Sequence, residues 1–227
     1  MQILAIFGIV LAAYLIGSIP NGLLIVKIKT GKDVRQIESG RTGGTNVLRA
    51  AGFLSGLLTA ILDITKGICA VLLAKYFFSE VPVAHMLAAV ASIIGHNYSI
   101  FMPEFGEDGK LVRFRGGAGG APALGAAIGL WTPVALYILP LAVLVYFTIG
   151  YASVTTFSIA FFAFVMFVIR YFQAPATSPV EYILFGVLAM VFLGWALRTN
   201  FAKLLEGNER VVSISLHGWL NKKKTPQ

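Results

Sequence analysis

The sequence is poor in charged residues. Asp, Glu, Lys and Arg make up 12% of its 227 residues, whereas hydrophobic residues make up 57%. Soluble domains carry about 25% charged residues, so this composition excludes an ordinary water-exposed surface. The mean hydropathy of +0.81 points the same way. We therefore predict an all-α, polytopic integral membrane protein.

Several chemical motifs are also absent. Cys69 is the single cysteine and lies in an apolar run, which excludes an intramolecular disulfide and a cysteine-rich metal site. HExxH, a Walker loop, clustered carboxylates and a Ser-His-Asp pattern do not occur. We expect no metal and no cofactor. The formal charge of +8 lacks a basic run interleaved with aromatics, so we expect no nucleic acid partner.

What the chain does contain is a series of long apolar runs. A helix that crosses the hydrocarbon core needs about 20 predominantly apolar residues. Between Gly119 and Gly150 the chain is apolar for long enough to cross twice, and Pro133 supplies a turn. The first run is too long for a signal peptide, so we expect it to be retained. We predict seven transmembrane helices: this pair and Ile3–Val26, Phe53–Phe78, Val83–Phe101, Ala152–Tyr171 and Val180–Leu197.

The basic residues are distributed unevenly between the two ends of these helices. With seven spans, 15 of the 18 lysines and arginines fall on one side, in segments 27–52, 102–118 and 198–227. Because basic connections stay in the cytoplasm, we predict an outside N-terminus and a cytoplasmic C-terminus. We expect residues 1–210 to form one membrane domain and residues 211–227 a basic cytoplasmic tail, part of which could lie at the lipid headgroups.

One segment on the predicted cytoplasmic side, SGRTGGTNVLR at 39–49, is polar and glycine-rich. Glycines such as Gly40 and Gly43 allow backbone N–H groups to converge on an anion, and a helix starting near Thr45 would add its N-terminal donors. A flexible loop with ordinary cytoplasmic arginines is the alternative. The side chains that would bind a phosphate are Ser39, Thr45, Asn46 and Arg49.

Two further clusters fall on the same side. His96 lies at the end of the third span, in GHNYS at 95–99, where a structural role is the alternative. The segment FRGGAGG at 114–120 opens a short helix and would form a second phosphate cradle or a close-packing segment. Its candidate residues are Arg115, Gly116, Gly117 and Gly119.

Asp63 and Lys66 lie inside the second predicted span, three residues apart. That spacing places them on one face of a helix. Ionisable groups inside a span are energetically costly and therefore suggest function. We favour a structural ion pair that braces the site.

Together these clusters resemble a known family, the bacterial acyl-phosphate:glycerol-3-phosphate acyltransferases. The resemblance is carried by SGxxGxTNVxR at 39–49, DxxKG at 63–67, GHxxSxF at 95–101, FxGGxG at 114–119 and NxxxLLxGxE at 200–209. The motifs occur in the same order and cover nearly the whole chain. The first is the most specific.

The resemblance implies a seven-helix enzyme of the bacterial plasma membrane whose active site faces the cytoplasm. Such an enzyme transfers a fatty acyl group from acyl phosphate to the sn-1 hydroxyl of glycerol 3-phosphate. The products are lysophosphatidic acid and phosphate, and the step belongs to phospholipid biosynthesis. The implied partners are these small molecules and membrane lipid, and we expect a monomer.

Site residues can be carried over one by one. Ser39, Thr45, Asn46 and Arg49 would cradle phosphate, and His96 would orient or polarise a substrate, so we place Ser39, Arg49 and His96 in the catalytic group. The glycines of the second loop would shape it. Ser153, Asn200 and Glu209 match later family positions and would contribute to substrate binding and site architecture.

The chain departs from the family pattern at two positions. The second loop has Ala118 where the family has lysine, and Leu197 stands where the last motif often has histidine. Both changes remove a polar group from a site that handles two phosphates. These departures leave two alternatives open: an acyltransferase for another phosphorylated acceptor, and a weak or inactive relative that binds phosphate or phospholipid. A small transporter is a third alternative, but transporters commonly place polar residues near the midplane of the membrane, and here they gather at one surface.

Overall fold

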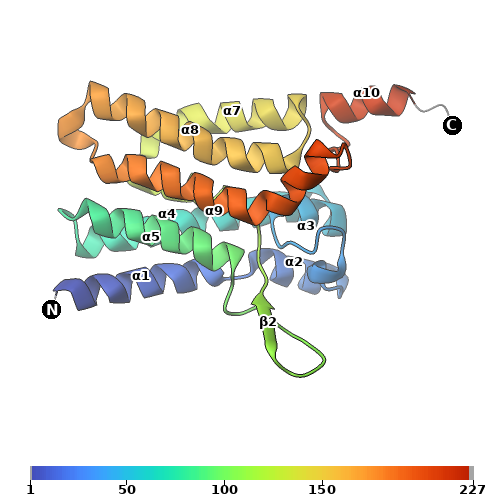
Figure 1. Cartoon of the computed structure of the whole chain (residues 1–227), viewed down its shortest axis with the longest axis horizontal. Coiled ribbons are helices and arrows are strands. Elements are labelled where there is room, and N and C mark those ends of the chain that lie inside the picture. The colour runs from blue at the N-terminus through green and yellow to red at the C-terminus, as the bar shows by residue number, and fades with distance from the viewer. Residues whose placement is uncertain (1, 225–227) are drawn as a thin grey trace.

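The structure is a computed structural model that describes residues 2–224, with side chains up to residue 220. Most of its helices lie along the long axis of the molecule (Figure 1). These are α1 (Gln2–Ser18), α4 (Phe53–Phe77), α5 (Pro82–Asn97), α7 (Ala135–Thr148), α8 (Ala152–Gln173) and α9 (Val180–Leu205). The shorter α6 (Gly120–Leu130) packs against α4, α5 and α8.

Four of the apolar segments in the described part of the chain are long enough to cross a membrane: Gln2–Thr30, Phe53–Phe77, Ala152–Gln173 and Val180–Leu205. Helix α5 has 16 residues, and α6 and α7 are also short. The turn predicted near Pro133 is present as η2 (Thr132–Val134) between α6 and α7. Lys75, in the last turn of α4, donates to the carbonyl of Leu130 at 2.9 Å, so α6 ends beside the end of α4.

The first span differs from the single helix expected over Ile3–Val26. It breaks after Ser18 and resumes as α2 (Asn21–Thr30). Pro20 explains the break, because proline lacks a backbone N–H and disfavours helical geometry in the residue before it. Helix α9 also differs, since it continues to Leu205 rather than ending at Leu197.

Small residues allow the helices to approach closely. A Cβ atom added at Gly67 would lie 2.3 Å from the carbonyl oxygen of Pro122, so α4 and α6 meet at this glycine. Gly17 and Gly95 bring α1 and α5 together in the same way, at 2.2 Å from the carbonyls of Ser92 and Tyr14. Membrane helices pack through such small residues because lipid provides no hydrophobic drive for their association.

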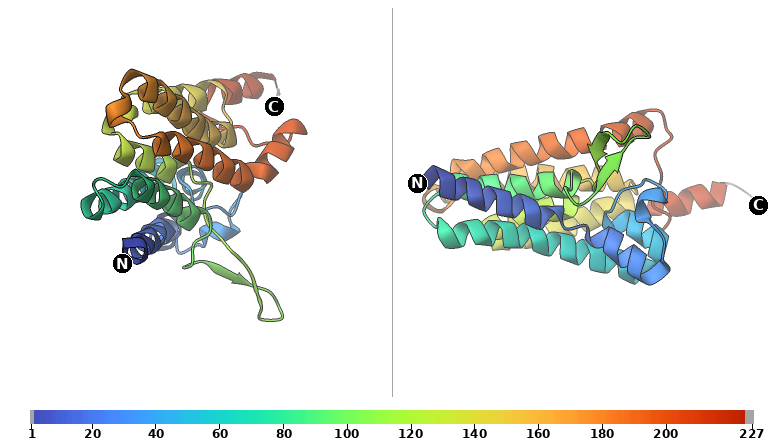
Figure 2. Two further views of the ribbon diagram at one scale, coloured as in Figure 1. Left: turned by 60° about the vertical axis from the view of Figure 1, so that its left-hand side comes forward. Right: turned by 90° about the horizontal axis from the view of Figure 1, so that it is seen from below.

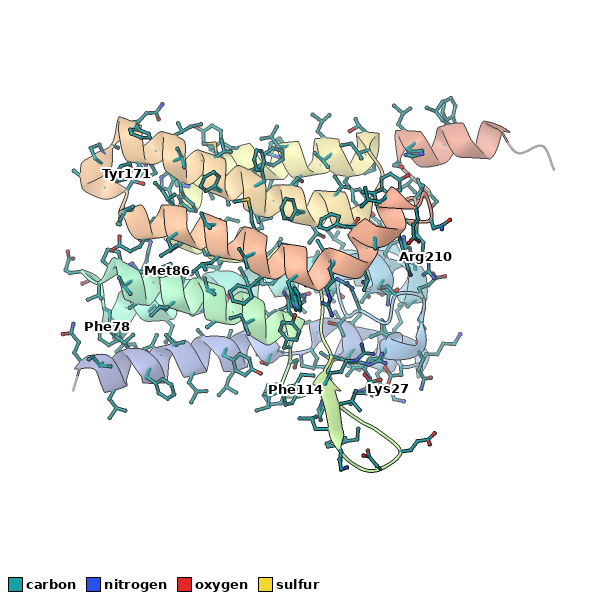
Figure 3. The ribbon with its side chains drawn as sticks, in the orientation of Figure 1. Lys27, Phe78, Met86, Phe114, Tyr171 and Arg210 are labelled. Atoms are coloured by element: carbon teal, nitrogen blue, oxygen red, sulfur yellow. The ribbon has the colours of Figure 1, made fainter. Side chains whose placement is uncertain are left out.

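The polar elements gather at one end of the molecule. Helix α2, helix α3 (Gly44–Ala51), a β-hairpin and helix α10 (Leu216–Lys224) lie toward the C-terminal end, and the N-terminus lies at the other end (Figure 1). Lys27 and Arg210 are at that polar end, whereas Phe78 and Tyr171 are at the opposite end (Figure 3). The basic segments expected on one side thus share one end of the fold.

The hairpin was not expected from the sequence. Strands β1 (Pro103–Phe105) and β2 (Leu111–Phe114) pair antiparallel and project sideways from the helices (Figure 2). Glu104 forms ion pairs with Arg113 and Arg115 across the two strands. These hydrogen bonds lower the pKa of Glu104 from its usual value to about 2.

The chain after α9 folds back on the bundle. Val211 forms a β-bridge with Tyr151, and the backbone N–H of Val212 donates to the carbonyl of Gly150 at 2.7 Å. Ser215 is buried against Gly150. The start of the predicted tail is therefore tied to the connection between α7 and α8, and helix α10 follows it.

Candidate active site

The break in the first span supplies polar groups to the centre of the candidate site. The carbonyl of Ile19, freed from helical bonding, accepts from Lys66 Nζ at 3.0 Å, and the carbonyl of Ser18 accepts from Ser99 Oγ at 2.6 Å. Asn21, at the start of α2, donates to Asp63 Oδ1 at 3.0 Å. The helix break therefore connects α1 and α2 to α4 and the end of α5.

Asp63 and Lys66 form the ion pair expected from their spacing, with 3.0 Å between Nζ and Oδ1. Lys66 Nζ also lies 2.8 Å from His96 Nδ1. A lysine ammonium can only donate, so His96 Nδ1 accepts, and the neutral imidazole then carries its hydrogen on Nε2. All three side chains are buried. This cluster sets the tautomer and the orientation of His96.

The second glycine loop lies directly over His96. The N–H of Gly117 donates to the His96 carbonyl at 2.9 Å, and a Cβ atom added at Gly117 would lie 1.9 Å from His96 Nε2. A Cβ atom added at Gly116 would lie 2.2 Å from the His96 carbonyl oxygen. Gly119 has φ +90° and is the N-cap residue of α6. Among the described residues, no side chain accepts a hydrogen bond from the first backbone N–H groups of this helix. Only glycine at positions 116 and 117 permits the loop to lie this close to His96.

The first glycine loop is held in shape by Asn46. Its side-chain amide donates to the carbonyls of Val34, Ile37 and Arg41 at 2.8–3.3 Å, and the residue is 3% exposed. This amide is therefore engaged in the loop itself. The 3-10 helix η1 (Val34–Gln36) precedes the loop, and the chain then turns at Gly40, where φ is +67°.

Arg41 links the first loop to α9. Its Nη2 donates to the carbonyl of Ala196 at 2.6 Å and to Asn200 Oδ1 at 2.9 Å. Asn200 in turn donates to Glu209 Oε1 at 2.9 Å. The N–H of Thr42, the next residue, donates to the Gly116 carbonyl at 3.3 Å. The two glycine loops and α9 thus meet around Arg41.

The remaining predicted residues occupy different positions. Ser39 is exposed in the first loop, and its Oγ accepts from the N–H of Arg41 at 3.4 Å. Arg49 is exposed on α3, and both Arg49 and Thr45 lie near Tyr146 of α7. Ser153, in the first turn of α8, is 2% exposed and its Oγ has no hydrogen-bond partner among the described residues.

Arg115 points away from His96. Its Nη1 donates to the Arg35 carbonyl at 3.1 Å, and its Nη2 donates to Glu104. The hydrogen bond with Glu104 raises the pKa of Arg115. Its guanidinium is therefore occupied beside a cavity of about 240 Å³ at the base of the hairpin.

The structure thus brings together His96, the second loop, Asn200 and Glu209, while Arg49 and Thr45 lie on α3 beside α7. Three residues in or beside this arrangement were not singled out from the sequence: Asn21, Arg41 and Tyr146. The position of Arg41 inside the glycine loop could have indicated its role. It was not singled out because many basic residues lie on the same side. Pro20 was the signal for Asn21, since a helix that restarts after proline exposes its first side chains.

Comparison with known proteins gives a consistent result. A family model described as glycerol-3-phosphate acyltransferase matches residues 7–207. The chain is 36% identical to a glycerol-3-phosphate acyltransferase of Thermus thermophilus, over 88% of this chain and 92% of that protein. It is also 36% identical to glycerol-3-phosphate acyltransferase 2 of Moorella thermoacetica, over 87% and 92%.

Solved structures agree. The crystal structure of PlsY (YgiH), an integral membrane glycerol 3-phosphate acyltransferase, in its glycerol 3-phosphate form, superposes with a TM-score of 0.77 at 30% identity. The alignment covers 91% of this chain and 95% of that one. The lysophosphatidic acid form gives a TM-score of 0.76 at 28% identity. With a family model over most of its length and these relatives, the chain belongs to the glycerol-3-phosphate acyltransferase family.

Proposed function

We propose that this protein transfers a fatty acyl group from acyl phosphate to the sn-1 hydroxyl of glycerol 3-phosphate. The observation that carries the proposal is the meeting of both glycine loops with His96 and Asn200 at the polar end of an apolar bundle. A site at that place can receive a water-soluble phosphate and a lipid-borne donor together. The same reaction gives lysophosphatidic acid and phosphate as products.

The proposed reaction does not require a strong general base from the protein. The acceptor hydroxyl attacks the carbonyl carbon of the acyl phosphate, a C–O ester bond forms, and the C–O bond to phosphate breaks. The hydroxyl proton passes to a phosphate oxygen, of the acceptor or of the leaving group. Because the phosphate is already a good leaving group, positioning and charge neutralisation supply most of the rate enhancement.

His96 suits the role of a donor in this scheme. Its Nδ1 accepts from Lys66, so the neutral ring has a hydrogen on Nε2 and cannot take up a proton there. Nε2 faces Gly117 in the second loop. Movement of this loop on substrate binding would let Nε2–H polarise the acyl carbonyl or hold a phosphate oxygen.

Phosphate binding falls to the two loops and their neighbours. Ser39, Thr45 and Arg49 supply hydroxyl and guanidinium donors, and the start of α6 adds backbone N–H groups favoured by the helix dipole. The glycines of both loops, Gly40, Gly43, Gly116, Gly117 and Gly119, allow close approach. Ser153 adds a buried hydroxyl, and Glu209 holds Asn200 in place. Asn46 maintains the first loop.

For the membrane arrangement, we extend the proposal to seven crossings. The short helices α5, α6 and α7 would cross together with the four long segments, which puts the N-terminus outside and the polar end in the cytoplasm. The imbalance of basic residues supports this orientation. The protein would act as a monomer in a bacterial plasma membrane, with residues 1–210 as its membrane domain and residues 211–227 as a basic cytoplasmic tail.

The decisive experiment is a direct assay. Purified protein is incubated with acyl phosphate and labelled glycerol 3-phosphate, and both lysophosphatidate and released phosphate are measured. We expect the two products in equal amounts, at a rate well above that of an Arg49→Ala variant. Equal background rates for both proteins would overturn the proposal.

Ala118 and Leu197 favour one second candidate, a non-catalytic relative that binds phosphate or phospholipid. Ala118 is half-buried in the second loop and Leu197 is buried in α9, and neither provides a donor. This candidate predicts binding of glycerol 3-phosphate by calorimetry without formation of lysophosphatidate. The acyltransferase proposal predicts both.

A further inference from the structure

Arg41 lies next to both of the segments that contain Ala118 and Leu197. The Arg41 guanidinium bonds to the Ala196 carbonyl and to Asn200, which flank Leu197 on α9. The following residue, Thr42, is tied to Gly116, two residues before Ala118. Arg41 and Thr42 therefore link the two segments in which the chain lacks a polar group.

Two other cations of this region are already engaged, and a third is exposed. Lys66 has three acceptors for its three hydrogens, at the Ile19 carbonyl, Asp63 and His96. Arg115 is held by Glu104 and a backbone carbonyl. Arg198 is exposed, and its guanidinium lies 4.5 Å from the ring centroid of Trp195. Lys66 and Arg115 are therefore not free to bind a substrate phosphate, and Arg198 lies on the exposed surface of α9.

Arg41 keeps an unused donor. Its Nη1 is buried and has no hydrogen-bond partner among the described residues, although Nη2 makes two bonds. Among the described residues, the only other arginine with a buried nitrogen that lacks a hydrogen-bond partner is Arg170, which lies beside Trp131. An unpaired buried donor is unfavourable, and a phosphate oxygen placed against Nη1 would remove the penalty.

The charge around Arg41 also favours an anion. Burial lowers the pKa of Arg41 from its usual value, while the nearby Glu209 carboxylate opposes the change. Glu209 is connected to Arg41 through Asn200 rather than through a direct bond. The guanidinium stays charged, because arginine does not lose its proton in proteins, and its positive charge is only partly balanced.

We infer that Arg41 is a substrate phosphate ligand of this protein and supplies the cation that the second loop lacks. Nη2 anchors the guanidinium to α9, and Nη1 binds a phosphate oxygen once the second loop has moved. The inference rests on the proposed acyltransfer reaction, in which the acceptor and the donor each carry a phosphate. The inference adds Arg41, a residue of the first glycine loop, to the phosphate-binding residues near the second glycine loop.

Relocating the charge tests this inference. The Arg41→Gln variant keeps a hydrogen-bonding side chain but removes the cation, and we expect kcat/KM for glycerol 3-phosphate to fall about 10- to 100-fold, as for the loss of a hydrogen bond to a charged group. Adding Ala118→Lys to Arg41→Gln puts a cation back from the second loop. We expect this double variant to recover most of the lost activity.

Ala118→Met in the same Arg41→Gln background is the matched control, because it adds similar bulk without charge. Equal activity of the lysine and methionine double variants would overturn the inference and leave Arg41 as a structural link between the first loop and α9. Wild-type activity in Arg41→Gln would overturn it as well. Arg41→Lys, which retains the charge, serves as a second variant if Arg41→Gln does not fold.

The same variants separate this inference from the proposed function. If the wild-type protein forms no lysophosphatidate, the acyltransfer proposal fails on its own. Calorimetric titration with glycerol 3-phosphate then tests Arg41 directly. We expect weaker binding by Arg41→Gln and restored binding by the Ala118→Lys double variant, and unchanged affinity in Arg41→Gln would contradict the role of Arg41.

Discussion

Lys66 shows how a single side chain organises the candidate site. Its ammonium group has three hydrogens, and three acceptors from three different segments lie within 3.0 Å: the Ile19 carbonyl, Asp63 Oδ1 and His96 Nδ1. Removing one partner of a buried ion pair is more harmful than removing both, because the remaining charge stays desolvated. Stability and the orientation of His96 therefore depend on the same residue.

We expect Lys66→Met to destabilise the protein by about 3–5 kcal/mol, since it leaves the Asp63 carboxylate unpaired. The double variant Asp63→Asn, Lys66→Met carries no buried charge and should recover much of that stability, while the new side-chain amide can still accept from Asn21. Thermal unfolding in detergent measures the difference. Activity should stay low in both variants because His96 has lost the donor to Nδ1. Recovery of full activity in the double variant would show that His96 does not need Lys66.

Gly117 gives a second prediction for a single residue. A methyl group there would lie 1.9 Å from His96 Nε2, so Gly117→Ala must displace either the ring or the loop. Misplacement of a reacting group by about 1 Å can cost about 100-fold in rate, and we expect a loss of that size in kcat. Gly8→Ala is the control, because nothing lies within 4 Å of the added methyl group. A Gly117→Ala enzyme with normal kcat would contradict the close contact with His96.

Among the helices, α4 and α6 pack closely because each has a glycine in contact with the backbone of the other helix. Gly67 faces the Pro122 carbonyl, and Gly125 of α6 faces the Ile64 carbonyl at 1.9 Å from its added Cβ. These contacts place the start of α6, and with it the second loop, next to Lys66 on α4. The geometry of the site is thus set by helix packing as well as by its loops.

Gly67→Ala should therefore destabilise the bundle by about 1–3 kcal/mol, the usual cost of overpacking. Gly194→Ala in α9 is a matched control, because its added methyl group would meet only Phe157, at 3.5 Å. The better helix propensity of alanine should leave that variant as stable as the wild type, or slightly more stable. Chemical unfolding in mixed micelles compares the two, and equal stability of both would contradict the packing at Gly67.

The hairpin offers a pH test at the same scale. The pKa of Glu104 is lowered to about 2, below its usual value. A group with a lowered folded-state pKa contributes stability that is complete above the unfolded pKa of about 4.5 and disappears as the pH falls through the folded pKa. We expect amide exchange in residues 103–114 to be unchanged between pH 8 and 5, after correction for its intrinsic pH dependence, and to accelerate below about pH 4.

Glu104→Gln supplies the reference for this measurement. It cannot ionise, so amide exchange in its hairpin, with the same correction, should not change across the same range. Because the ion pairs are partly exposed, added salt should reduce the difference between the two proteins. A wild-type hairpin that behaves like the Glu104→Gln variant at every pH would show that these ion pairs do not stabilise it.

For the whole molecule, the main feature is the separation of polar and apolar parts. Lys27 and Arg210 mark the polar end, and Phe78 and Tyr171 mark the other (Figure 3). Large apolar side chains on the outside, such as Ile3 at 86% and Leu136 at 76% exposure, would face lipid in a membrane. A protein of this shape can hold a soluble phosphate at one end and a lipid donor along its side.

The proposed orientation can be measured with single cysteines. In a Cys69→Ser background, Lys110→Cys at the hairpin tip should react with a membrane-impermeant maleimide only in inside-out vesicles. Glu80→Cys, in the turn between α4 and α5, should react only in intact cells. Reaction of both cysteines from the same side would contradict an odd number of crossings between these positions and the orientation that follows from it.

Much of this organisation could be predicted from the sequence. Apolar runs of about 20 residues placed the long helices along the chain, because burial of backbone in lipid allows few other structures. Their ends were less predictable, since the first span breaks at Pro20 and α9 continues to Leu205. The turn near Pro133 and the Asp63–Lys66 pair followed from local chemistry. The hairpin did not, since its residues alternate weakly and its stability comes from cross-strand ion pairs of Glu104.

From the sequence alone it follows that this is a helical membrane protein, that its polar clusters belong to one end, and that its motifs are those of the glycerol-3-phosphate acyltransferase family. These features depend on composition, periodicity and local chemistry. Three contacts, by contrast, are set by how the chain folds: Arg115 with Glu104, Arg41 with Asn200, and Lys66 with His96. Each of these depends on which distant segments come within hydrogen-bonding distance, and the packing of the helices sets that distance.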